Sequence, residues 1–192
     1  MRRIHRIAPS LLAATALAVS ALAACGGSTS PSDDPAPGAS LARDDGAPFQ
    51  TDSLAYTLRP GTVGYEGEVA LTFTNRSAST AYIVNCNGLT GVTFEKLVDG
   101  RWEAVWGPAI PDCLSPAIVV PPGGTWRTRV HVFSAFPGSN VEPKFRTPEI
   151  AGVYRTVWHY VLRSFQPRLP FGEPFPLEAR VSNRFTLAVR PR

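Results

Sequence analysis

Between Ser53 and Val189 the chain repeatedly alternates apolar and polar residues, which is typical of strands with one buried face. No stretch of helical period competes with this alternation. In 126–132, Trp126, Thr128, Val130 and Val132 share one face, while Arg127, Arg129 and His131 take the other. The clearest alternating stretches are 53–59, 68–74, 80–84, 93–98, 101–106, 126–132, 153–163 and 181–189. We therefore expect an all-β domain.

Turn signals separate these stretches. Asp99-Gly100 lies between two alternating runs and predicts a hairpin, because both central residues of a type I′ turn need positive φ. Pro121-Pro122-Gly123-Gly124 predicts a turn that leads into the 126–132 strand. In the long 153–163 stretch we expect Tyr154, Thr156, Trp158, Tyr160 and Leu162 to face the core. About seven strands without a helix indicate a β-sandwich.

The order of four short motifs resembles the bacterial immunoglobulin-like domains found in exported proteins. The motifs are Leu71–Asn75, Phe94–Trp102, Val120–Gly124 and Gly152–Arg155. The resemblance spans roughly Ser53 to Val189, and it implies an immunoglobulin-like antiparallel β-sandwich of about seven to nine strands. Tyr154 fits the tyrosine corner, in which a phenol hydrogen-bonds backward to a connecting loop. The chain departs from the pattern between Cys86 and Cys113 and in the connection from Gln166 to Leu177.

The N-terminal residues have the three parts of a secretory signal: Arg2, Arg3 and Arg6, an apolar run from Ile7 to Ala23, and small residues before a cleavage site. Leu22-Ala23-Ala24-Cys25 resembles the lipobox of bacterial lipoproteins. The resemblance implies that residues 1–24 are removed and that Cys25 receives a covalent lipid, a thioether-linked diacylglycerol. We expect no other cofactor. The protein would be exported and anchored to the cell membrane or the outer membrane, with its domain facing the periplasm or the exterior.

Two alternatives stay open for this segment: an ordinary signal with a chance cysteine, and a short membrane anchor that is never cleaved. The second is disfavoured because a spanning helix needs roughly 20 apolar residues. The apolar run is shorter and is broken by Pro9, Ser10, Thr15 and Ser20.

Residues 25–48 read as a disordered tether, because they contain almost nothing large and apolar. Coil of this length reaches about 25 Å on average. Residues 49–192 remain as one domain. The formal net charge of +4 falls to +1 once Arg2, Arg3 and Arg6 leave with the signal. A near-neutral exported chain without clustered lysines and arginines gives no reason to expect nucleic acid as a partner.

Cys86 and Cys113 are the two cysteines left in the domain, and such a pair in an oxidising compartment usually forms a disulfide. The alternative is a metal site that uses both thiolates with His131 or His159. It lacks close ligand spacing, so we expect no metal.

The connection from Gln166 to Leu177 is rich in proline and is flanked or occupied by Phe165, Arg168, Phe171 and Phe175. One interpretation is a rigid hydrophobic loop that contacts another protein, with Arg168 as a polar anchor. The other is that the phenylalanines fold back and cap the open end of the sandwich.

A basic sheet face is the second candidate surface, and it requires that two strands be neighbours. Its members would be Arg127, Arg129, His131, Arg155, His159 and Arg163. Such a face could bind an acidic partner, a glycan or lipid headgroups. It could equally be a solvated face that prevents sheet stacking.

The sequence gives no support for catalysis: it has no G-x-S-x-G elbow, no nucleotide loop and no paired acids set in a cleft. The leading hypothesis is a non-catalytic, membrane-anchored module that binds an envelope protein or a cell-wall component. One alternative is a proteinase inhibitor that uses an exposed rigid loop. Another is a carbohydrate-binding module, which would need an exposed Trp102, Trp106, Trp126 or Trp158 as a sugar platform.

Overall fold

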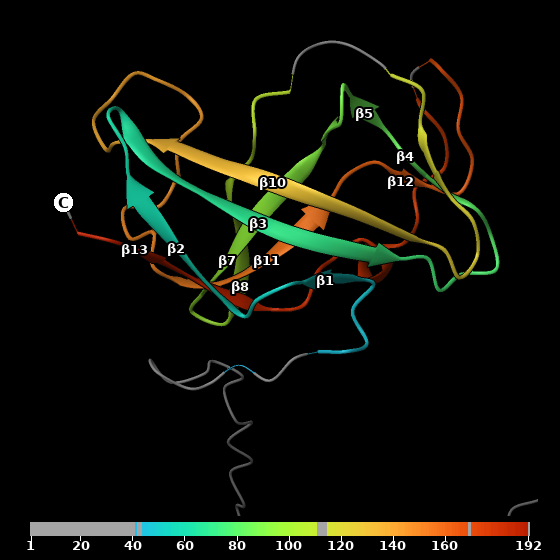
Figure 1. The fold of residues 1–192 in the computed structure, drawn as a ribbon, viewed down its shortest axis with the longest axis horizontal. Coiled ribbons are helices and arrows are strands. Elements are labelled where there is room, and N and C mark those ends of the chain that lie inside the picture. Colours follow the sequence, from blue (N-terminus) through green and yellow to red (C-terminus); the bar gives the residue numbers. More distant parts are fainter. Residues whose placement is uncertain (1–40, 42–43, 111–114, 169, 192) are drawn as a thin grey trace, which may run out of the picture. The chain divides into compact units, whose positions relative to one another are not determined.

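Strands account for almost all regular structure in the chain (Figure 1). The computed structural model describes residues 41, 44–110, 115–168 and 170–191. No described residue is α-helical, and nothing in these ranges has the length and apolar content that a membrane-crossing helix requires. In chain order the elements are β1 Phe49–Thr51, β2 Ala55–Pro60, β3 Gly64–Thr74, β4 Ala81–Ile83, β5 Asn85–Cys86, β6 Leu89–Thr90, β7 Val92–Val98, β8 Arg101–Trp106, β9 Ile118–Val120, β10 Thr125–Ala135, β11 Gly152–Trp158, β12 Val161–Leu162, the 3-10 turn η1 Leu177–Ala179 and β13 Phe185–Val189.

The strands form a two-layered sandwich, which confirms the expected all-β fold. One layer contains β10 and β1 on either side of β3, and the other runs β2, β13, β11, β7, β8. The last residues of β2, Arg59 and Pro60, pair with β3 and so connect the two layers. β2 and β13 pair in parallel, whereas the other paired strands run antiparallel. Two smaller sheets, β12-β4-β9 and β5-β6, complete the set.

Aromatic rings from both layers meet in the core. Phe49 is fully buried, and its ring stacks on Phe73 of β3 at 4.6 Å and on Trp158 of β11 at 4.8 Å between centroids. A second group joins Phe94, Trp106, Tyr154 and Phe185 through edge-on and stacked contacts. The alternation in β3 and β10 confirms the expected faces, because Val69, Leu71, Phe73, Val130 and Val132 are buried.

The alternation predicted for 153–163 breaks after Trp158, and Tyr160 does not face the core. A turn at His159 and Tyr160 ends β11, so Tyr160 is 44% exposed, while Val161 and Leu162 are both buried. The Arg180 guanidinium holds this turn by donating to the carbonyls of Trp158 at 3.0 Å and His159 at 3.2 Å.

Two of the predicted turns are present. Asp99 and Gly100 have φ values of 49° and 75° between β7 and β8, as a type I′ hairpin requires. At the turn before β10, the Gly124 N–H donates to the Pro121 carbonyl at 2.9 Å. Asn75, at the end of β3, donates from its buried side-chain amide to the carbonyls of Ser79 and Val120 and so fixes the start of β10. These contacts define the position at which β10 begins.

Tyr154 forms the expected backward hydrogen bond. Its hydroxyl, fully buried, donates to the Ile150 carbonyl at 2.5 Å, and burial raises the pKa of Tyr154 well above its usual range.

Tyr154→Phe leaves that carbonyl without its partner, so we expect the free energy of unfolding to fall by about 1–3 kcal/mol. Urea unfolding measures this loss. Tyr160→Phe, at an exposed ring whose hydroxyl makes no hydrogen bond within the described chain, is the control; equal losses in the two variants would contradict the prediction.

Candidate interaction surfaces

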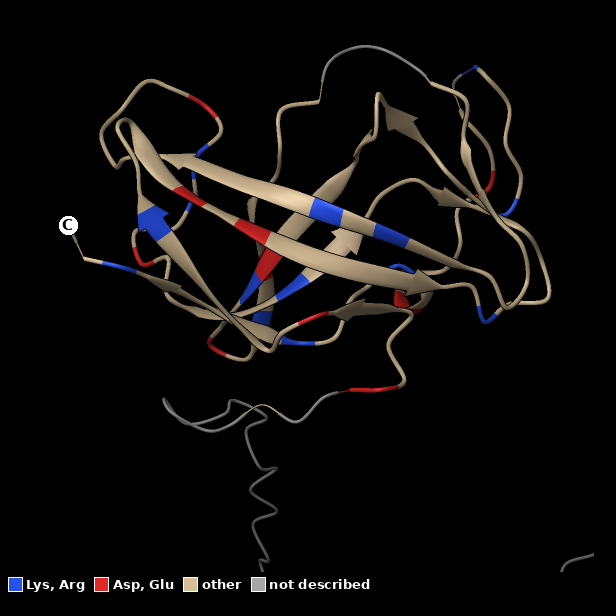
Figure 2. Cartoon of the chain, in the orientation of Figure 1, with Lys and Arg blue, Asp and Glu red and all other residues tan. Residues whose placement is uncertain are grey.

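The outer face of β10 carries three of the residues expected in the basic face. Arg127, Arg129 and His131 are all exposed, and they alternate with the inward-facing Val130 and Val132. Figure 2 shows two adjacent basic bands on β10 and two acidic bands on β3 that lie further along the pair. In the register, Glu68 lies opposite His131 and Glu66 lies opposite Phe133. Arg129 lies 3.5 Å from Glu68, with both side chains more than half exposed, and such a pair contributes little to stability. Arg127 has no ion pair within the described chain.

The other three residues of the predicted basic face lie elsewhere. β10 pairs with β3, whereas β11 pairs with β7 and β13, so the two strands are not neighbours and the six residues do not form one face. Arg155 is engaged by Glu95 at 2.7 Å on the opposite layer. His159 lies in the turn after β11, and Arg163 lies 4.0 Å from Glu173 on a separate hairpin.

A groove of about 610 Å³ runs beside the β10 arginines. Ala70 and Thr72 lie opposite Arg129 and Arg127 in the β3–β10 register, and Asp52 lines the groove with them. The Tyr56 hydroxyl donates to the Asp52 carboxylate. Two guanidiniums therefore line a groove in which the one carboxylate is already hydrogen-bonded.

The proline-rich connection forms a closed hairpin, residues 163–173, of which Leu169 lies outside the described residues. The Arg163 N–H donates to the Glu173 carbonyl at 2.7 Å, and the Gln166 N–H donates to the Phe171 carbonyl at 2.8 Å. Gly172 has φ of 143°, and a Cβ there would lie 1.9 Å from the Ser164 carbonyl oxygen. The chain therefore requires glycine at this position of the hairpin.

The three phenylalanines of this region pack against the sandwich. Phe175 is 6% exposed and belongs to the core. Phe165 stacks on Tyr82 at 6.4 Å, and Phe171 meets Tyr160 edge-on at 5.6 Å. Arg168 is exposed near the tip. The aromatic groups thus anchor the hairpin, as the capping interpretation expects, and they leave Arg168 and its proline neighbours outward.

None of the four tryptophans offers a free flat ring. Trp106 and Trp158 are buried, and Trp126 packs edge-on against Trp158 at 5.5 Å. Trp102 is partly buried on the outer side of β8, where the guanidinium carbons of Arg155 and Arg184 lie 4.5 and 5.7 Å from its ring centroid. Cation–π contacts of this kind compete with a stacked sugar.

Thr93 and His159 form a close polar pair. Their Oγ1 and Nε2 atoms lie 2.6 Å apart. Partial burial lowers the pKa of His159, and the Arg180 guanidinium lowers it further. The imidazole and the Thr93 hydroxyl share one hydrogen bond, and the tautomer of the neutral ring sets which of the two atoms donates. No hydrogen bond within the described chain reaches the other ring nitrogen, so the pair lacks the orienting group of a catalytic triad.

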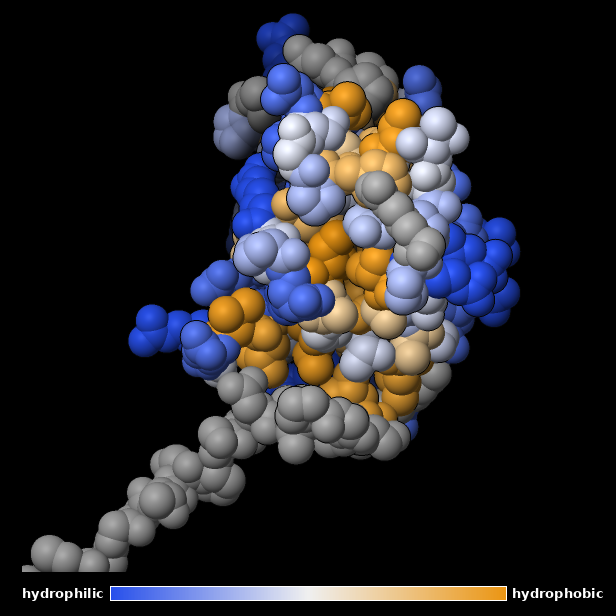
Figure 3. Space-filling model, turned by 90° about the vertical axis from the view of Figure 1, so that its left-hand side faces the viewer, coloured by the Kyte–Doolittle hydropathy of each residue, from blue (hydrophilic) through white to orange (hydrophobic). Residues whose placement is uncertain are grey.

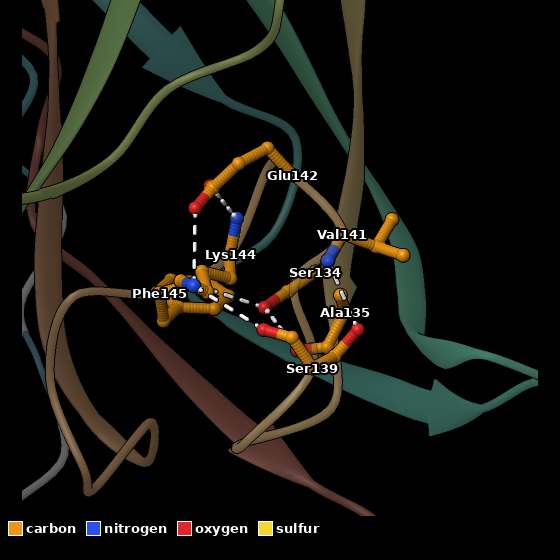
Figure 4. Close-up of polar contacts among 7 residues, drawn as sticks. All are labelled: Ser134, Ala135, Ser139, Val141, Glu142, Lys144 and Phe145. Atoms are coloured by element: carbon orange, nitrogen blue, oxygen red, sulfur yellow. Dashed lines mark hydrogen bonds and ion pairs between the residues drawn. The ribbon is translucent and has the colours of Figure 1, made fainter.

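The long connection between β10 and β11 satisfies its own polar groups (Figure 4). Lys144 lies 3.2 Å from Glu142 and donates to the Ser139 carbonyl, while the Phe145 N–H donates to the buried Ser134 hydroxyl at 3.0 Å. Figure 3 shows the end of the domain where this connection lies, with apolar surface at its centre and hydrophilic residues around it. No sequence motif marks this connection, and its polar contacts are structural.

Residues 1–40, which include Cys25, and residue Cys113 lie outside the described residues, so the lipid anchor and the disulfide stay predictions. Cys86 is buried on β5. Among the residues that the structure describes, no cluster of three or more His, Cys, Asp or Glu side chains could hold a metal ion.

A scan of protein-family models, a search of curated proteins and a search of solved structures each found no match to this chain.

The lowered pKa of His159 predicts a pH-dependent stability. Because its pKa in the folded state lies below the usual value of about 6.5, the unfolded chain binds more protons as the pH falls. Above the unfolded-state pKa, neutral His159 contributes its full stabilisation. This stabilisation is lost as the pH falls from the unfolded-state pKa through the lower folded-state pKa. Urea unfolding at pH 7.5 and pH 5 should show a smaller loss in His159→Gln than in the wild type. His131→Gln, at an exposed position, should keep the wild-type difference; a similar reduction in both variants would contradict this assignment.

Proposed function

We propose that this chain is an exported, lipid-anchored protein of the cell envelope whose immunoglobulin-like sandwich is a non-catalytic binding module. The Leu22–Cys25 motif behind a positively charged, apolar segment supports the anchor. Two or three acyl chains attach a protein far more firmly than one. The domain then works within the reach of its tether, on another envelope protein or a cell-wall component.

The observation that carries the binding role is the pair Arg127 and Arg129 beside an open groove. The other two arginines of the predicted face are engaged by the domain itself: Arg155 pairs with Glu95 and contacts Trp102, and Arg163 contacts Phe175. Arg127 and Arg129 are exposed, and within the described chain their one ion pair is the weak contact of Arg129 with Glu68. The face of β10 is thus the best-supported binding surface, ahead of the Phe-containing hairpin.

A non-catalytic role is supported by the nature of the polar pairs. No described carboxylate hydrogen-bonds to the His159 imidazole, and the described carboxylates Glu142 and Glu173 pair with neighbouring basic groups. Nucleophilic catalysis needs such an orienting partner and donors for an oxyanion.

Proteinase inhibition is the second candidate, because the 163–173 hairpin is closed by two backbone hydrogen bonds and projects Arg168. A rigid loop loses little conformational entropy on binding. A panel of proteases tests this candidate: inhibition that is abolished by Arg168→Ala and retained in Arg127→Gln/Arg129→Gln would favour the inhibitor.

The carbohydrate-binding alternative has less support, since each tryptophan is buried or contacts other side chains.

We also propose the disulfide between Cys86 and Cys113. Export places the pair in an oxidising compartment, and the buried position of Cys86 on β5 suits a structural bond. A loop of this length would contribute about 3–4 kcal/mol in the chain-entropy model.

Replacement of the lipid-bearing thiol tests the anchor. Cys25→Ser removes the acceptor of the acyl chains, so we expect the protein to move from the membrane fraction to the soluble fraction. Fractionation followed by immunoblotting measures this. Cys86→Ser should leave the protein membrane-bound; a Cys25→Ser protein that stays with the membrane would contradict the anchor.

The binding surface is tested by capture from envelope extract with the detergent-solubilised chain. Arg127→Gln/Arg129→Gln should lose its captured partners, because the guanidiniums supply the anion contacts. Arg101→Gln/Arg190→Gln changes two exposed arginines elsewhere and should capture as the wild type does. Equal capture by both double variants would contradict the assignment of binding to β10.

A further inference from the structure

Strand β10 presents an unpaired edge over its first half. It pairs with β3 along its whole length, from Thr125 opposite Thr74 to Ala135 opposite Gly64 (Figure 1). On the other side, the Trp106 indole donates to the Phe133 carbonyl at 2.9 Å, and the Ala135 N–H donates to the Pro143 carbonyl at 3.0 Å. These two contacts lie along the second half of the edge. Leu89, Thr90 and Pro108 line a small pocket of about 90 Å³ with Arg129 and His131, but no backbone hydrogen bond joins them to β10 within the described chain.

The direction of those contacts shows which backbone groups point outward. In an antiparallel pair, both the N–H and the C=O of a residue point to the same side, and the side alternates along the strand. Because Phe133 and Ala135 use groups that point away from β3, the odd-numbered residues Thr125, Arg127, Arg129 and His131 point the same way. None of these four makes a backbone hydrogen bond to any described segment outside the β3–β10 ladder.

The residues with outward backbone groups also carry the basic side chains. Arg127, Arg129 and His131 lie on the solvent face of the same strand, next to the groove over Ala70 and Thr72. A strand added to this edge would place alternate side chains about 4.5–5.5 Å from them, the distance between directly opposite cross-strand neighbours. The edge therefore offers backbone hydrogen bonds and a row of positive charge along one line.

We propose that the Thr125–His131 edge of β10 binds an extended acidic segment of a partner protein as an added strand, with carboxylates at alternate positions. This assignment rests on the proposed binding function and names its partner class. Charge selects the occupant. A second copy of β10 would bring arginine beside arginine or histidine, which is destabilising, and an apolar strand would leave the guanidiniums without counter-charge.

Arginines on an edge strand ordinarily keep other strands away. Here the same guanidinium charges disfavour pairing with strands that lack carboxylates and favour pairing with a strand that carries them. The arginines therefore protect the edge and also select the partner. Strand addition takes its affinity from main-chain hydrogen bonds and its specificity from alternate side chains. On β10 the specificity elements are Arg127 and Arg129.

The test uses the full chain in a neutral detergent and a capped peptide of the sequence Thr-Glu-Val-Glu-Val-Glu-Thr. A matched peptide with Gln at the three Glu positions keeps the length and loses the charge. We expect the Glu peptide to bind at least about tenfold more tightly than the Gln peptide, measured by fluorescence anisotropy. Arg127→Gln/Arg129→Gln should remove the preference for Glu, whereas Arg101→Gln/Arg190→Gln should keep it. Equal binding of the two peptides to the wild type would overturn the proposal.

Amide hydrogen exchange distinguishes edge binding from binding to the face. On the edge, the peptide should slow exchange at Arg127 and Arg129, while the amides of Thr128 and Val130, which point toward β3, change little. Arg127→Pro gives the same distinction, because it removes an outward N–H and leaves the ladder to β3 intact. It should weaken the Glu peptide beyond the effect of Arg127→Gln; equal weakening, together with unprotected Arg127 and Arg129 amides, would overturn the edge geometry.

The outcomes separate this inference from the broader function. If the peptide fails to bind while capture of the envelope partner still depends on Arg127 and Arg129, the edge proposal is wrong and the binding module stands. If capture is also independent of these arginines, both are wrong.

Discussion

The stack of Phe49 on Phe73 and Trp158 is the contact on which the rest of the domain depends. It joins a ring from each layer of the sandwich, and all three rings are almost completely buried. Because the stack includes β1, it also holds this first strand against both layers. The described residues just before β1, which the sequence predicts as tether, contact the domain as well: Ala47 is buried, and the Arg76 guanidinium donates to the Asp45 and Gly46 carbonyls. Asn183 reinforces this position by accepting from the Thr51 N–H and donating to the Thr51 hydroxyl, so the first strand is held by packing and by polar contacts together.

Once the layers are joined in this way, β10 lies at the border of its sheet. Its inward face completes the core with Val130 and Val132, and among the described strands β3 is the one that pairs with it. The strand is therefore rigid, because one side of it is packed and hydrogen-bonded, and it is available, because the other side is not. A rigid and accessible strand binds an extended partner at a low entropic cost.

The two arginine environments show how the fold divides structural from available charge. Arg155 is mostly buried against Glu95 and Trp102, so its guanidinium is part of the layer that carries β7, β8 and β11. Arg127 and Arg129 have the same chemistry but stand over a groove lined by Ala70 and Thr72, which are too small to cover them. The aromatic residues divide similarly, since Phe165 and Phe171 pack on tyrosines and only the tip of their hairpin faces outward.

The sequence by itself determined the all-β class, the buried faces of β3 and β10, the Asp99-Gly100 hairpin and the tyrosine corner, because each depends on neighbours within a few residues along the chain. It also supplied Arg127, Arg129 and His131 as one alternating set. Only the tertiary structure decided that β10 and β11 lie in different layers and that a turn at His159 and Tyr160 breaks the alternation. It also decided that the first half of β10 makes no backbone hydrogen bond to any described segment on the side away from β3. These features depend on which distant strands pair, and a local pattern of side chains does not determine the order of strands in a sheet.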